Sequence, residues 1–142
     1  KDVYVSGNIT VVGTVDGKDV STLGIGDMSY ADSRFKYLSF TRDTATGAGT
    51  QGVTGVGFSP KSVMFLASIN STNFVSVGYD DGTTGGSVAT EVPNVWTVGG
   101  TNAINIYGKH YATDVAMNAD GFTITWAGTG TGIIDIMALA KR

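Results

Sequence analysis

The residues of this chain best suited to acid–base chemistry are its single histidine and an aspartate four positions later. His110 and Asp114 lie in the sequence YGKHYATD, and a histidine oriented by a carboxylate supplies two members of a serine-hydrolase triad. The chain has no G-x-S-x-G motif, whose sharp turn exposes a nucleophilic serine. We therefore interpret His110 as a structural histidine, rank an enzyme below every binding function, and predict no catalytic residues.

The carboxylates and glycine-rich runs do not follow the spacing of a cofactor motif. Asp80-Asp81-Gly82 lacks the D-x-D-x-D-G pattern and the distal glutamate of a calcium loop, so it reads as a hairpin turn. Gly128–Gly132 precedes an expected strand, whereas a phosphate-binding loop precedes a helix. The chain also has no cysteine, which removes thiolate zinc sites and thiol nucleophiles. We predict no cofactor and no metal site.

Binding is favoured over catalysis because aromatic residues gather at the expected strand ends and loops. An aromatic ring can stack on a sugar ring while Asp and Asn side chains bind the sugar hydroxyls. The candidate ligand-binding residues, for a sugar ligand, are Tyr79, Trp96, Tyr107, His110 and Tyr111. The alternative interpretation is that Trp96 and Tyr107 belong to the core or to a subunit interface.

Length and composition narrow the class of protein that must position these residues. A chain of 142 residues holds about one domain, with room for a short arm. Hydrophobic residues make up 42% and charged residues 15%, which favours a packed core over a disordered tail. The net charge is −3 and the nine Lys and Arg residues are scattered, so we expect no nucleic-acid partner. No apolar run approaches the length of a membrane span, and we expect no membrane insertion. Because Lys1 is not an initiator Met, we expect the chain to begin inside a longer product.

From Phe58 onward, short apolar runs alternate with turn signals, which predicts an all-β domain. The expected strands are 62–69, 73–79, 87–92, 95–98, 103–109, 121–126 and 132–140. Residues 41–57 read as a connector that ends in an edge strand. We predict an antiparallel β-sandwich of jelly-roll type, forming a head domain over residues 43–142.

Two of these strands carry further detail. In FTITW, Phe122, Ile124 and Trp126 share one face, which we expect to be core. Residues 132–140 are apolar on both faces, which predicts a central strand or one covered by a second subunit. Asp135 interrupts that run, and a carboxylate facing a buried layer needs a partner.

Residues 1–42 read as an arm that cannot be stable alone. Its first part alternates apolar and polar residues, which predicts short strands too few to bury their own apolar face. Residues 27–38 are expected to be a short helix, with Asp27 or Ser29 as its N-cap. Its apolar stripe either packs on the β-domain or forms a bundle between subunits. We expect the arm to associate with copies of itself through the interface residues Val3, Val5, Ile9, Val11, Met28, Phe35 and Leu38.

Two stretches resemble structural proteins of tailed-bacteriophage virions. SGNITVVGTVDGKDVS (6–21) with YADSRFKYLS (30–39) resembles the strand repeats and the A-D-x-R-F/Y-x-x-L joint of phage fibre and appendage proteins. A second set is similar in content and order to a small β-domain of phage virion proteins. It consists of GFSPKSVMFLASI (57–69), VSVGYDDGTTGG (75–86), DGFTITWAGTG (120–130) and IIDIMALA (133–140).

The resemblance implies a homotrimeric fibre- or spike-like projection at the surface of the virion. Its implied partners are its own copies, capsid or tail proteins of the same particle, and host-surface polysaccharide. Two alternatives stay open. One is a capsid decoration protein that stabilises the head lattice, and the other is a carbohydrate-binding module.

Overall fold

A computed structural model describes residues 14–15, 18–19, 34–70, 73–91, 95–106 and 110–142. The chain divides into two compact units, Lys1–Ser33 and Arg34–Arg142. In the first unit, β1 (Thr14–Val15) pairs with β2 (Lys18–Asp19) in antiparallel fashion. The remaining predictions for residues 1–13 and 20–33, including most of the expected helix, lie outside the described residues.

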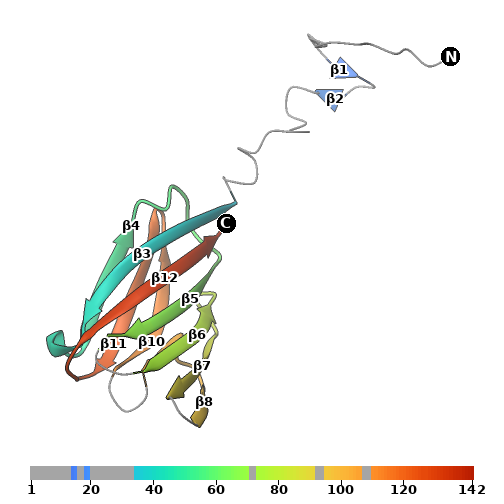
Figure 1. Ribbon diagram of the computed structural model, residues 1–142. Coiled ribbons are helices and arrows are strands. Elements are labelled where there is room, and N and C mark those ends of the chain that lie inside the picture. Colours follow the sequence, from blue (N-terminus) through green and yellow to red (C-terminus); the bar gives the residue numbers. More distant parts are fainter. Residues whose placement is uncertain (1–13, 16–17, 20–33, 71–72, 92–94, 107–109) are drawn as a thin grey trace, which may run out of the picture. The chain divides into compact units, whose positions relative to one another are not determined.

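The second unit is built from two antiparallel sheets (Figure 1). Its elements are β3 (Phe35–Asp43), the 3-10 turn η1 (Thr44–Thr46), β4 (Gly49–Thr54), β5 (Ser62–Ile69), β6 (Phe74–Asp80), β7 (Gly85–Glu91), β8 (Val95–Gly99), β9 (Ile104–Ile106), β10 (His110–Asn118), β11 (Gly121–Gly128) and β12 (Ile133–Lys141). The six-stranded sheet has the order β3-β12-β5-β6-β7-β8, and the four-stranded sheet has the order β4-β11-β10-β9. The all-β prediction is confirmed, and β4 is an edge strand as expected.

Alternation of side chains along the strands decides which face of each sheet is buried. In β12, Ile134 and Ile136 are buried while Met137 and Leu139 are exposed. Successive residues of a strand point to opposite faces, so an apolar set at every second position suffices to make a core layer. β12 lies between β3 and β5, so it is an inner strand of its sheet, while the side chains of its outer face are exposed in the single chain.

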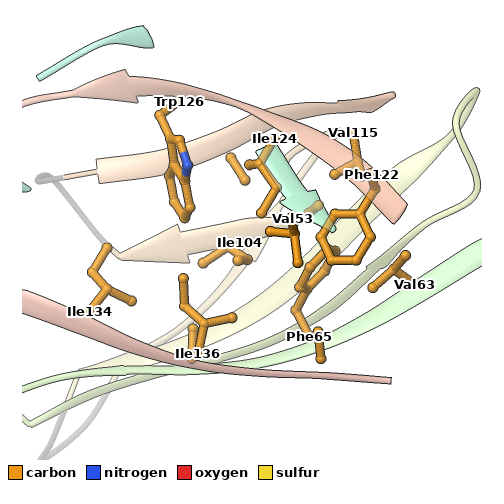
Figure 2. Close-up of a cluster of buried hydrophobic side chains, with 14 of the residues drawn as sticks. Val53, Val63, Phe65, Ile104, Val115, Phe122, Ile124, Trp126, Ile134 and Ile136 are labelled. Atoms are coloured by element: carbon orange, nitrogen blue, oxygen red, sulfur yellow. The ribbon is translucent and has the colours of Figure 1, made fainter. Parts of the chain in front are cut away.

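The inner faces of the two sheets contribute to one hydrophobic core (Figure 2). Phe65 of β5 meets Phe122 of β11 edge to face, with ring centroids 5.8 Å apart and planes at 79°. Ile124 and Trp126 are buried on the same face of β11 as Phe122, as the FTITW pattern predicts. Edge-to-face aromatic pairs of this kind stabilise a core beyond the area that they bury.

The expected helix over 27–38 is wrong in its last part, because Phe35–Asp43 is the strand β3. β3 pairs along its whole length with β12, from Phe35↔Lys141 to Asp43↔Ile133. Phe35 is exposed, whereas Leu38 packs against the core, so the two residues lie on opposite faces rather than on one helical stripe. Long-range pairing with β12 outweighs the local helical spacing. The compact unit accordingly begins at Arg34 and takes in residues 34–42, which the sequence assigns to the arm.

The order of the strands does not confirm the jelly-roll topology. β5, β6, β7 and β8 follow one another as a meander within a single sheet.

Close approach of β9 to this meander depends on Gly78 of β6, where an added Cβ would collide with the carbonyl oxygen of Ala103. The missing side chain at Gly78 therefore lets the backbones of the two sheets meet directly.

Candidate functional site

The outer face of the six-stranded sheet carries the large apolar side chains that this fold leaves exposed. Among the described residues, every exposed large hydrophobic side chain lies there, each 37–61% exposed. We call this set the apolar face. Its residues are Phe35, Tyr37, Met64, Leu66, Val75, Val77, Tyr79, Val88, Ile133, Met137 and Leu139. Single exposed apolar residues are normal on a protein surface, but their concentration on one face is not.

Strand register joins these residues into continuous rows. One row crosses four strands as Tyr37, Leu139, Met64 and Tyr79. Residues directly opposite each other on neighbouring strands have Cβ atoms about 4.5–5.5 Å apart, so each row forms a connected surface.

A second row, next to the first, is Met137, Leu66, Val77 and Val88. The strands β3, β12, β5, β6 and β7 therefore hold a single apolar surface together.

A third row borders the apolar rows with polar residues. It contains Thr41, Asp135, Ser68, Val75 and Thr90. Asp135 lies exposed on this border, and not against a buried layer as the sequence suggests. The surface is gently hollowed here, with an open depression of about 470 Å³ lined in part by Ser68, Val75 and Asp135.

A buried polar cluster joins the two sheets on their inner side. Arg42 of β3 donates from Nε to Nε2 of His110 at 3.4 Å and from an Nη atom to the Gly47 carbonyl at 2.6 Å. The His110 ring stacks on Trp126 with centroids 5.2 Å apart, and the Arg42 guanidinium lies 5.6 Å from the Trp126 ring centroid. Trp126 Nε1 donates to Gln51 Oε1 at 3.1 Å.

The electrostatics of this cluster keep His110 neutral. Burial lowers the pKa of His110, the Arg42 guanidinium lowers it further, and the Gly128 backbone opposes these effects to a smaller extent. Because Nε2 accepts a hydrogen bond from Arg42, the neutral ring carries its proton on Nδ1. The ring is 0% exposed, so its position suits a structural role and not proton exchange with a substrate.

The Asp80-Asp81-Gly82 turn is held by its own side chains. The Asp81 carboxylate accepts from the Thr83 hydroxyl at 2.7 Å and from the backbone N–H groups of Thr84 and Thr83 at 2.7 and 2.9 Å. The Thr83 hydroxyl, followed by these two N–H groups, lowers the pKa of Asp81 to about 2. The Asp81 N–H donates to the Thr84 carbonyl at 3.2 Å. The predicted hairpin turn between β6 and β7 is confirmed.

The candidate ligand-binding residues do not gather at one place. Tyr79 belongs to the apolar face, while His110 lies in the core and Tyr111 is half-buried on β10. The side chain of Trp96 on β8 and the whole of Tyr107 lie outside the described residues.

Two of the predicted interface residues can be placed. Phe35 lies on the apolar face, and Leu38 packs against the core. The described part of the chain does not include Val3, Val5, Ile9, Val11 and Met28.

Sequence reasoning missed most of the apolar face, including Met64, Leu66, Val77, Met137 and Leu139. The signal that could have found it is the pair of segments SVMFLASI and IIDIMALA, which are apolar on both faces. Such segments either lie between two buried layers or are covered by another chain.

No protein-family model matches this chain, and neither a curated protein nor a solved structure matches it. Within the described residues, no helix is long and apolar enough to cross a membrane.

Proposed function

We propose that this chain is a structural component of a tailed-bacteriophage virion. In this proposal it forms a homotrimeric fibre- or spike-like projection whose head is a β-sandwich and which contacts host-surface polysaccharide. The observation that carries the proposal is the apolar face, since a chain that presents so much apolar surface is suited to permanent assembly.

The chemistry of the described residues supports a structural role. The one histidine is buried with Arg42 and Trp126, and the Asp80-Asp81 pair is engaged in a turn. Both groups hold strands together: the His110 cluster joins the two sheets, and the Asp80-Asp81 turn links β6 to β7. The resemblance of the strand motifs to a phage virion β-domain supplies the kind of particle.

The trimeric state is tested by native mass spectrometry of the full chain at micromolar concentration. A mass three times that of the chain is expected. A monomer at this concentration would overturn the proposal.

The place of the chain on the particle is tested by immunogold labelling of phage whose genome encodes it. Gold at the tail or at projections is expected. Even labelling over the capsid would favour the capsid decoration protein instead, and a particle without label would refute a virion role altogether.

A further inference from the structure

We infer that the apolar face is the surface through which copies of this chain contact one another. The inference rests on the proposed function for the trimeric state, and it adds the strands and side chains that form the contact. It also moves the centre of the expected interface from the first residues of the chain to the outer side of β12, β5 and β6.

The size of the apolar face matches one side of a stable interface. Exposed fractions of 37–61% over its side chains amount to on the order of 800 Å² of apolar surface, more than the largest patch of about 300–600 Å² on a typical monomer. A standard protein interface buries about 800 Å² on each partner. The apolar face alone therefore supplies the area that a lasting contact needs.

The chemistry of the apolar face favours a second copy over a different protein. Its two central rows hold Tyr, Leu, Met and Val side chains and no charged residue. In a cyclic trimer that turns this face toward its axis, a charge at the centre of the contact would lie close to its own copies, and this face avoids that repulsion. Permanent interfaces between subunits resemble a protein core cut in half, and these rows have that composition.

The polar residues beside the apolar rows also fit a contact between copies of the chain. Thr41, Asp135, Ser68 and Thr90 border the apolar rows on one side. Interfaces typically have an apolar centre and a polar rim that stays in contact with water. Met64 and Met137 lie within the apolar rows, and the flexible methionine side chain adapts well to an opposing pleated surface. Leu66 of β5 and Val77 of β6 are directly opposite each other in the strand pairing, and we place them at the centre of the contact.

The test compares a charge placed at that centre with the same charge placed elsewhere. Val77→Lys puts an ammonium group in the middle of the apolar face, whereas Ala116→Lys puts it on an exposed position of β10 in the other sheet. Both substituted side chains point to solvent in a single subunit, so circular dichroism should show an unchanged fold. Burying an unpaired charge at a contact centre should weaken self-association of the full chain by at least about 30-fold. Native mass spectrometry over a concentration series measures this.

The possible results separate the inference from the proposed function. A trimeric wild type and Ala116→Lys, with Val77→Lys dissociated, support both. A wild-type dimer that Val77→Lys dissociates supports the surface and overturns the trimer. A trimer that survives Val77→Lys overturns the surface and leaves the function standing. A wild-type monomer overturns both.

Thiol labelling decides the question if Val77→Lys fails to fold. The chain has no cysteine, so Val77→Cys and Ala116→Cys each carry one thiol and differ little in size from the native residues. In the assembled state a maleimide should label Val77→Cys much more slowly than Ala116→Cys, and dilution to the monomer should remove the difference. Equal labelling in the assembled state would overturn the inference.

Discussion

Acidification tests the buried cluster of Arg42, His110 and Trp126 most directly, because His110 is the only histidine of the chain. Burial, with the Arg42 guanidinium adding to it, lowers the pKa of His110 in the folded state from 6.5. In the unfolded chain the ring titrates near its ordinary value. As the pH falls below 6.5, the unfolded state therefore binds a proton that the folded state does not, and the free energy of unfolding decreases.

The size of the effect has an upper limit set by one proton. Below pH 6.5 the free energy of unfolding falls by at most about 1.4 kcal/mol for each pH unit, until the folded-state pKa is reached. At pH 7.5 the unfolded histidine is already mostly neutral, so the total loss between pH 7.5 and 5.5 is at most about 1.4 kcal/mol. The loss approaches this limit as the folded-state pKa falls below 5.5.

Urea denaturation at pH 7.5, 6.5 and 5.5 measures the loss, with Trp fluorescence as the signal because Trp126 stacks on His110. The matched variant is His110→Gln, which keeps an acceptor for Arg42 but does not titrate. The Asp81 carboxylate, with a pKa of about 2, stays ionised throughout this range. Asp80, whose pKa is raised chiefly by burial, is present in both proteins and acts in the opposite direction on acidification. The wild type should therefore lose stability relative to His110→Gln. Equal losses in the two proteins would refute the account of the cluster.

Three further substitutions test the packing, each by urea denaturation at neutral pH. Phe122→Ala should lower the free energy of unfolding by about 3–5 kcal/mol, because it leaves a cavity where the sheets meet; a loss below 1 kcal/mol would contradict that position. Gly78→Ala should lower the free energy of unfolding by about 1–3 kcal/mol, since the new methyl group meets backbone atoms. Gly52 has open space around it, so Gly52→Ala should lower the free energy of unfolding by less. Equal losses in the two variants would contradict the close approach of the backbones at Gly78. Asp120→Ala should lower the free energy of unfolding by about 1 kcal/mol, because the Asp120 carboxylate accepts hydrogen bonds from the N–H groups of Gly55 and Gly57 at 3.1 and 2.5 Å. An unchanged urea midpoint would show that these bonds do not stabilise the loop.

Short apolar runs bounded by turn signals were enough to predict the strands whose inward residues are strongly apolar, such as those in residues 62–69 and 121–126. They failed where the decisive interaction is distant in sequence. The segment RFKYL has helical spacing, and only its pairing with β12 makes it part of β3. β10 was missed because a register shift between Ala112 and Asp114 interrupts its alternation.

The apolar face could be predicted only in part for a related reason. Residues 132–140, which are apolar on both faces, predicted a central strand or one covered by a second subunit. The register of five strands decides which apolar residues lie on the same side of the sheet. The same register adds Tyr37 and Val88 to the apolar face. No single window of the sequence contains that information.

The pairing of β3 with β12 also decides how the second unit responds to mechanical load. The Arg142 N–H donates to the Arg34 carbonyl at 2.9 Å, so these two residues lie at the same end of the antiparallel pair. A force that separates residue 34 from residue 142 loads the hydrogen bonds one rung at a time, and the strands unzip from Phe35↔Lys141 inward. A force between residue 34 and the opposite end of β12 would instead load the whole ladder at once in shear. A unit tethered through residue 34 therefore withstands tension best when the load leaves it near Ile133.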